Sequence, residues 1–218
     1  MLYFTHKLLE EHKTKDLVKR LLMSTGWVDG QTASARGSKI KRNLQLNIGE
    51  EHSKFSNEII NVIENDTAIK GYSFPAKIFN ILFTRTGVGM FYGAHMDEPY
   101  INSIRRDLSF TIFLNDPKDY KGGELILYIS PERKQIKMKP GEMIIYPTKY
   151  LHEVKEVTEG ERMVCVGWIE SEIPKDDDRE SMYFMKKGMT EITNKLGITP
   201  ATQYLNISFN NIYKRFSS

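Results

Sequence analysis

The sequence predicts a mainly β protein with flanking helices, built around a double-stranded jelly roll. Short β-rich segments recur between Lys77 and Ile169 at the spacing of about eight to twelve residues that is typical of all-β domains. Turn residues such as Asn115-Asp116-Pro117 and Lys139-Pro140-Gly141 separate them. Segments with helical periodicity lie before and after this region. Eight short strands fit two sheets that fold face to face, an arrangement that limits exposed sheet edges.

The N-terminal segment, residues 1–76, is predicted to hold supporting helices and a long loop. Apolar residues at helical spacing predict one helix over about residues 11–24 and another over about residues 50–64. Between them, the stretch from Trp27 to Asn43 is rich in Gly, Ser, Thr, Arg and Lys and lacks periodicity, which predicts a loop. Loops of this length in compact domains often serve as lids or binding loops.

The predicted jelly-roll core covers residues 77–172, and a predicted C-terminal helical extension covers residues 173–218. The expected strands of the core are 77–83, 90–96, 108–114, 124–129, 135–138, 143–146, 151–157 and 163–169. In the extension, Asp176-Asp177-Asp178 suits a helix N-terminus, and Thr199-Pro200 suits the cap and first position of a final helix. These helices are expected to cover the sheet or to form a homodimer with a second copy.

Composition and charge exclude several classes of protein. The chain is 40% hydrophobic and 27% charged, and it has no apolar run near the roughly 18 residues of a membrane span. The N-terminus lacks the features of a secretory signal, and the single cysteine, Cys165, cannot form an internal disulfide, so a cytoplasmic location is expected. A net charge of +3 does not indicate nucleic-acid binding. A basic cluster is interpreted as a solvated loop; its members are Arg36, Lys39, Lys41 and Arg42.

The residues that carry chemistry begin with His95 and Asp97. Side chains two positions apart on an extended chain point to the same face, so these two can bind one ion together. His152, on a distant predicted strand, can complete a 2-His-1-carboxylate triad, which suits non-heme Fe(II) because it leaves positions open for a cosubstrate and O2. A lone H-x-D motif is weak evidence for a metal site, since histidines in strands are more often hydrogen-bonded core residues. The remaining histidines are expected in surface or capping roles: His6, His12 and His52.

Arg162 follows His152 by ten residues and is predicted to lie on a hairpin partner of its strand. A planar guanidinium can bind both oxygens of the far carboxylate of a small diacid such as 2-oxoglutarate, whose other end chelates iron. An ordinary surface arginine is the alternative. Because side chains alternate along a strand, both residues point inward only if the turn is a three-residue Glu159-Gly160-Glu161 loop or carries a bulge.

These residues belong to a larger set of motifs that resembles the PKHD-type hydroxylases, which are prolyl-4-hydroxylase-like Fe(II)/2-oxoglutarate-dependent dioxygenases. The set comprises Tyr92-Gly93-Ala94-His95-Met96-Asp97, Arg106-Asp107-Leu108-Ser109, Gly122-Gly123-Glu124-Leu125, Tyr146-Pro147, Leu151-His152-Glu153-Val154 and Glu159-Gly160-Glu161-Arg162, with Trp168. The resemblance extends over nearly the whole chain. It implies a double-stranded β-helix core, with His95, Asp97 and His152 as the catalytic iron ligands and Arg162 as the anchor of 2-oxoglutarate.

The resemblance also implies the cofactors: Fe(II), 2-oxoglutarate as cosubstrate, O2, and ascorbate as the reductant that keeps the iron ferrous. The chain departs from its relatives at Arg85-Thr86, where they carry Arg-Tyr, so Tyr92 or Tyr146 is expected to supply the missing ring in the cosubstrate pocket. Asp97 argues against halogenating relatives, which lack this carboxylate. Trp168 replaces the second arginine of nucleic-acid demethylases, so a nucleic-acid substrate is not expected.

The implied reaction is hydroxylation of a substrate, with decarboxylation of 2-oxoglutarate to succinate and CO2. The substrate stays open between a prolyl or other peptide side chain and a small molecule; a membrane partner is not expected. The residues that select it are expected in the stretches Trp27 to Asn43 and Glu98 to Arg106. Two other functions stay open: a non-catalytic jelly-roll module or sensor that binds metal and 2-oxoglutarate, and a Zn(II) hydrolase, because two histidines and an aspartate also suit zinc.

Overall fold

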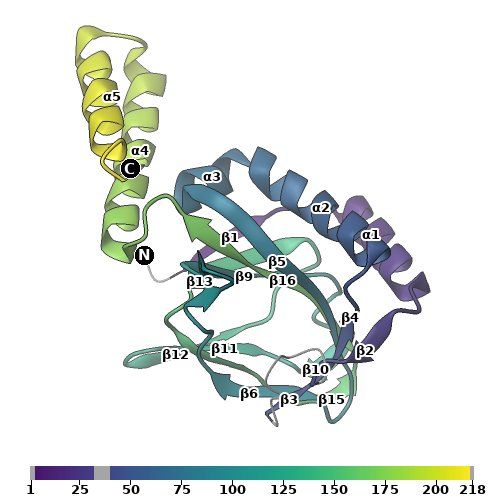
Figure 1. Cartoon of the computed structure of the whole chain (residues 1–218). Coiled ribbons are helices and arrows are strands. Elements are labelled where there is room, and N and C mark those ends of the chain that lie inside the picture. The colour runs from purple at the N-terminus through teal and green to yellow at the C-terminus, as the bar shows by residue number, and fades with distance from the viewer. Residues whose placement is uncertain (1–2, 32–39, 217–218) are drawn as a thin grey trace.

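Two antiparallel sheets form the centre of the molecule in the computed structural model, which describes residues 3–31 and 40–216 (Figure 1). The larger sheet has seven strands, in the spatial order β1 (Phe4–Lys7), β13 (Glu142–Pro147), β9 (Leu108–Phe113), β16 (Arg162–Ser171), β5 (Pro75–Thr86), β4 (Leu44–Leu46) and β2 (Trp27–Asp29). The smaller sheet has five, in the order β12 (Glu132–Ile136), β11 (Leu125–Ile129), β14 (Leu151–Val154), β6 (Phe91–His95) and β3 (Lys41–Arg42).

Two short ribbons and five helices complete the described structure. The ribbons pair β7 (Tyr100–Ile101) with β8 (Ile104–Arg105), and β10 (Tyr120–Gly122) with β15 (Val157–Gly160). The helices are α1 (Glu11–Met23), α2 (Glu50–Asn65), α3 (Thr67–Ser73), α4 (Asp176–Leu196) and α5 (Pro200–Tyr213). None of the helices within the described ranges is both long enough and apolar enough to cross a membrane.

Apolar side chains from both sheets fill part of the space between them. One buried cluster joins Phe113, Ile144, Tyr146 and Val164 of the larger sheet to Leu125, Leu127, Ile129 and Ile136 of the smaller sheet. Each fully buried side chain of this size stabilises the fold by about 1.5–3 kcal/mol. The two sheets therefore face each other across an apolar core, which confirms the predicted jelly-roll core.

The helices α1, α2 and α3 cover the outer face of the larger sheet (Figure 1). Leu21 of α1 and Ile59 and Ile63 of α2 are fully buried in one cluster with Phe83 and Phe110 of the sheet. Because the central strands are covered on both faces, all six residues of β9 are buried. Cys165 lies in the same cluster, and burial raises the pKa of its thiol.

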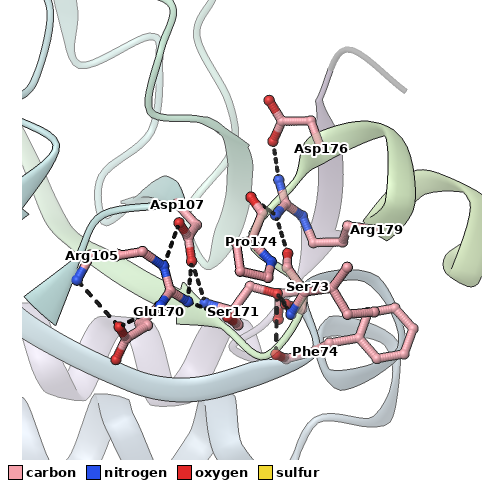
Figure 2. A network of polar contacts seen from close by, with 10 residues as sticks. Ser73, Phe74, Arg105, Asp107, Glu170, Ser171, Pro174, Asp176 and Arg179 are labelled. Atoms are coloured by element: carbon pink, nitrogen blue, oxygen red, sulfur yellow. Dashed lines mark hydrogen bonds and ion pairs between the residues drawn. The ribbon is translucent and has the colours of Figure 1, made fainter. Parts of the chain in front are cut away.

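The helices α4 and α5 form a hairpin that projects away from the sheets (Figure 1). Thr199 caps α5 and Pro200 begins it, as predicted. A polar network fixes the start of this hairpin to the core (Figure 2). In it, Arg105 donates to Asp107 and to the Ser171 carbonyl, the Ser171 N–H donates to Asp107, and Arg179 donates to the Ile173 carbonyl. This network anchors the segment that connects β16 to α4.

The predicted strands and helices are all present, with shifted ends, and the errors lie in short elements. The predicted loop from Trp27 to Asn43 is wrong at both ends, because β2 and β3 lie there. Strands of two or three residues are too short to display a period-two pattern; pairing with β4 and β6 stabilises them instead. Residues 32–39, the middle of this predicted loop, lie outside the described residues. The predicted boundaries between the segments 1–76, 77–172 and 173–218 stay predictions. Strands β1, β2 and β4 of the first segment are part of the larger sheet, together with strands of the predicted core.

Candidate metal centre

His95 and His152 lie opposite each other on neighbouring strands of the smaller sheet, β6 and β14. Asp97 follows two residues after the end of β6. The Nε2 atoms of His95 and His152 are 3.7 Å and 3.9 Å from Asp97 Oδ1, and the three ligand atoms all lie within 4.8 Å of one another. Strand pairing and the two-residue spacing together thus bring the predicted triad to one point.

Hydrogen bonds to the backbone fix the orientation of both imidazoles. The Nδ1–H of His95 donates to the Gly93 carbonyl at 2.8 Å, and the Nδ1–H of His152 donates to the Tyr150 carbonyl at 2.9 Å. Because a carbonyl can only accept, each Nδ1 carries the hydrogen, and each Nε2 keeps a lone pair directed toward Asp97. This is the tautomer that a metal-binding histidine needs.

The Asp97 carboxylate is held by its other oxygen. Asp97 Oδ2 accepts hydrogen bonds from Ser109 Oγ and from Trp168 Nε1, both at 2.9 Å, while Oδ1 faces the histidines. No such role was predicted for Ser109 or Trp168. The sequence does contain a signal for Trp168, because it lies six residues after Arg162 on β16. An even spacing places both side chains on one face of a strand, so Trp168 should point toward the same site as Arg162.

The surroundings favour metal binding over protonation. Burial and the nearby His152 lower the pKa of His95. Metal ligands must be deprotonated, so a neutral imidazole at neutral pH is ready to bind. Two imidazole nitrogens and one carboxylate oxygen form the donor set of non-heme Fe(II) sites, and the residues present therefore fit Fe(II).

A cavity of about 670 Å³ adjoins the triad between the two sheets. Strands β5, β9 and β16 line it from the larger sheet, and β6, β11 and β14 line it from the smaller sheet. Small-molecule sites commonly have volumes of about 300–1,000 Å³. The cavity can therefore hold a small cosubstrate beside the metal residues.

Arg162 is the first residue of β16, and its side chain lines this cavity although only 3% of the residue is exposed. Its guanidinium lies 5.6 Å from the centre of the Phe113 ring, and its Nε is a buried donor with no hydrogen-bond partner among the described residues. The Tyr120 hydroxyl lies close to this guanidinium: burial raises the pKa of Tyr120, and the Arg162 charge acts in the opposite direction. A buried cation with an unused donor is costly unless an anion pairs with it, so the site fits the carboxylate of a small diacid.

The predicted hairpin between the strands of His152 and Arg162 is wrong. Strand β15 lies between β14 and β16 in the chain, and it pairs with β10 in a separate ribbon. His152 belongs to the smaller sheet and Arg162 to the larger. Both side chains point into the cavity because the two sheets face each other, so the length of the Glu159-Gly160-Glu161 turn does not decide their orientation.

Tyr92 and Tyr146 both line the cavity, and each contacts a different histidine of the triad. The Tyr92 ring stacks on His95 with centroids 3.7 Å apart, and burial raises its pKa to about 12. Tyr146 is buried and meets the His152 ring edge-on at 5.5 Å. Burial and the charge of Asp97 raise the pKa of Tyr146, whereas Arg162 acts in the opposite direction. Tyr146 therefore lies within electrostatic range of both the metal residues and Arg162.

Two residues lie in different surroundings from those predicted. Lys41, interpreted from the sequence as part of a solvated loop, is buried and lines the cavity, whereas Arg42 is exposed. His52, expected at the surface, is buried and contacts the Ile81 carbonyl through Nε2 at 2.8 Å. Lys41 belongs to the two-residue strand β3, and His52 lies in the first turn of α2; their burial depends on tertiary packing, which local polarity cannot reveal. Arg36 and Lys39 lie outside the described residues.

Comparisons with known proteins agree with this site. A sequence model of the 2OG-Fe(II) oxygenase superfamily matches residues 81–170. A PKHD-type hydroxylase of Prochlorococcus marinus strain MIT 9313 is 38% identical over 217 residues and covers 98% of each chain. A second PKHD-type hydroxylase, from strain NATL1A of the same species, is 39% identical over 221 residues, with 99% of each chain covered.

Solved structures show the same fold. A prolyl-4-hydroxylase of Pseudomonas putida superposes with a TM-score of 0.59 and 17% identity, over 78% of this chain and 92% of that one. A prolyl hydroxylase from Trichoplax adhaerens, in complex with a peptide fragment of the hypoxia inducible factor oxygen degradation domain, gives a TM-score of 0.59 and 18% identity. That match covers 77% of this chain and 83% of the other.

Proposed function

The chain belongs to the PKHD-type hydroxylases of the 2OG-Fe(II) oxygenase superfamily, and we propose that His95, Asp97 and His152 hold its Fe(II) while Arg162 holds 2-oxoglutarate. The enzyme is an Fe(II)- and 2-oxoglutarate-dependent hydroxylase. When bound, iron, 2-oxoglutarate and O2 supply the oxidising power that places one oxygen atom in a substrate C–H bond, as 2-oxoglutarate becomes succinate and CO2.

The observation that carries this assignment is the placement of two complementary sites in one cavity. The Nε2 atoms of His95 and His152 and Oδ1 of Asp97 converge at one side, and the unpaired Nε of Arg162 lies in the same enclosed space. A zinc hydrolase has no use for a buried arginine there. A diacid uses both sites, because one end chelates the metal at the triad and the other end pairs with Arg162.

Each protein group has a definite task in this proposal. His95 and His152 present neutral Nε2 atoms because their Nδ1–H groups are held by backbone carbonyls. Asp97 binds through Oδ1 because Ser109 and Trp168 occupy Oδ2. The three ligands leave the remaining coordination positions to the cosubstrate and O2.

Tyr146 and Arg162 form the cosubstrate side of the cavity in this proposal. Tyr146 packs beside His152 and replaces the ring that relatives carry at the position of Thr86, which itself lines the cavity. Tyr92, stacked on His95, is assigned to the substrate side. Together these residues exclude water from the space between the metal and Arg162.

The test uses purified protein loaded anaerobically with Fe(II) and 2-oxoglutarate. We expect a visible charge-transfer absorption band from the chelate, followed by succinate when O2 is admitted. His152→Ala should lose the band because it lacks a ligand; His52→Ala, which removes a buried histidine outside the cavity lining, is the control. A band without succinate, even with cell extract present, would favour a sensor. Turnover with zinc in the absence of O2 would favour a hydrolase.

Four finer assignments belong to the same proposal. Ascorbate serves as the reductant that keeps the iron ferrous. The substrate is a peptide side chain or a small molecule, and the relative crystallised with a peptide supports the former. The protein acts in the cytoplasm as a homodimer through α4 and α5, whose exposed apolar side chains support such a contact; they include Phe184, Leu196, Tyr204 and Ile207.

A further inference from the structure

A buried lysine lies in the cavity on the side of the metal residues. Lys41 is only 7% exposed, and its Nζ donates to Gln45 Oε1 at 3.1 Å. The same Nζ lies 5.5 Å from the centre of the Tyr92 ring, and that ring stacks on His95. Lys41 is therefore separated from one metal-binding residue by a single aromatic ring.

Arg106 occupies the matching position beside another metal-binding residue. Its guanidinium lies 4.2 Å from the centre of the Trp168 ring, and Trp168 donates to Asp97. Its buried Nε has no hydrogen-bond partner among the described residues, and its Nη1 makes a long contact of 3.5 Å to the Glu98 carbonyl. Arg106 thus retains donors that can bind a further anion.

Loading the inner part of the cavity adds no net negative charge to balance Lys41 and Arg106. The formal charges of Fe(II), ionised Asp97, the 2-oxoglutarate dianion and Arg162 sum to zero. Lys41 and Arg106 then remain as excess positive charge in a partly desolvated space, where an unpaired charge is costly.

The nearby acids do not remove this excess. Asp29 acts on Lys41, and Glu98 acts on Arg106. Both acidic side chains are exposed to solvent, which screens their charges. Among the described residues that line the cavity, Asp97 and Glu98 are the carboxylates, against the three cations Lys41, Arg106 and Arg162.

We propose that the substrate of this hydroxylase carries an oxyanion group, a carboxylate or a phosphate, which Lys41 and Arg106 hold beside the metal residues. The inference rests on the proposed function, because it requires iron and 2-oxoglutarate to fill the inner part of the cavity. Arg106 supplies a planar pair of donors, and Lys41 supplies a compact charge. Holding the substrate by this group places a neighbouring C–H bond beside the metal, and it also selects against neutral molecules of the same shape.

The experiment measures anion binding next to the metal. Protein is loaded with Mn(II) and saturating 2-oxoglutarate, so that the inner subsite is filled, and is titrated separately with inorganic phosphate and with 13C-labelled acetate. Paramagnetic Mn(II) speeds the nuclear relaxation of any anion bound near it, so a saturable increase in the 31P or 13C relaxation rate reports binding beside the metal. The two probes distinguish a phosphate subsite from a carboxylate subsite.

We expect saturable binding of at least one anion, weakened about tenfold or more by Lys41→Met and by Arg106→Met, since each loses a charge-assisted contact. Arg106→Lys retains the charge and should recover part of the affinity. Lys54→Met removes a lysine whose side chain is 72% exposed on α2, and should bind like the wild type. The charge-transfer band with Fe(II) and 2-oxoglutarate checks that every variant is folded and loaded.

The outcomes separate this inference from the proposed function. A wild type that does not bind metal and 2-oxoglutarate refutes the proposed function and this inference together. A loaded wild type that binds neither anion, or variants that bind both as tightly as the wild type, overturns the inference alone. Equal weakening in Lys54→Met would also overturn it, because the effect would then follow net charge and not the cavity.

Discussion

Removing the indole donor from Asp97 should weaken metal binding without removing a ligand. Trp168→Phe deletes the N–H that donates to Asp97 Oδ2 at 2.9 Å, and it keeps an aromatic ring beneath the Arg106 guanidinium. The Asp97 side chain is only 9% exposed, so water replaces the lost donor poorly. The carboxylate then becomes free to rotate away from the position in which Oδ1 faces both histidines.

The magnitude follows from the bond that is lost. A hydrogen bond to a charged group contributes about 1.5–3 kcal/mol, and about 1.4 kcal/mol corresponds to a tenfold change in affinity. We therefore expect Mn(II) or Fe(II) binding to weaken about 10-fold to 100-fold, the range found for hydrogen-bond partners of metal ligands. Ser109 donates to the same oxygen and retains part of the restraint, so the double variant Trp168→Phe/Ser109→Ala should lose more than either single variant.

Electron paramagnetic resonance of free Mn(II) measures this affinity directly in the absence of 2-oxoglutarate. The chain contains one other tryptophan, and Trp27→Phe is the matched control, because the Trp27 indole donates to the Leu21 carbonyl, outside the metal centre. The expected order is wild type equal to Trp27→Phe, both tighter than Trp168→Phe. If Trp168→Phe bound Mn(II) as tightly as the control, the hydrogen bond would have no role in orienting Asp97.

Three further predictions test the cosubstrate site and the core. Arg162→Met should weaken 2-oxoglutarate binding by about 2–5 kcal/mol, because it removes a buried charged contact, and calorimetry should find Mn(II) affinity unchanged. Gly167→Ala should destabilise the fold by about 1–3 kcal/mol in urea unfolding, since a Cβ there would lie 2.6 Å from Phe110 Cζ. Gly188→Ala, in an open position of α4, should instead stabilise by up to about 1 kcal/mol, and equal effects would contradict the packing argument. Burial raises the pKa of the Cys165 thiol above its usual 9.0, so its contribution to stability is fully present below pH 9.0 and is lost as the pH rises toward the folded-state value; Cys165→Ala should abolish that part of the pH dependence.

The sequence was sufficient to predict the long strands and helices and the residues of the triad. Strands such as β5 and β16 have enough residues for their pattern to appear, and the capping pair Thr199-Pro200 is a local signal that needs no tertiary contact. The triad was predictable because His95, Asp97 and His152 form a chemically recognisable donor set. Local signals and ligand chemistry thus determine these parts of the structure.

Other features depend on how distant segments pair, which a single sequence does not display. Val157 begins a strand that pairs with β10, so the chain leaves the smaller sheet before it enters β16, and the expected hairpin does not form. Lys41 belongs to a polar stretch, yet pairing of β3 with β6 places it beside Tyr92 inside the cavity. Its burial follows from the sheet, and no property of residues 39–43 alone predicts it.

The proposed metal centre joins the two sheets, and this division explains why the sequence indicated the triad but not the side chains that support it. His95 and His152 belong to the smaller sheet, whereas Ser109 and Trp168, the donors to Asp97, belong to the larger one. Asp97 therefore meets the histidines only when the sheets are correctly packed. Metal affinity and the packing between the sheets must be linked, since a ligand that binds only the folded arrangement stabilises it. Bound metal should accordingly oppose any change that separates the sheets.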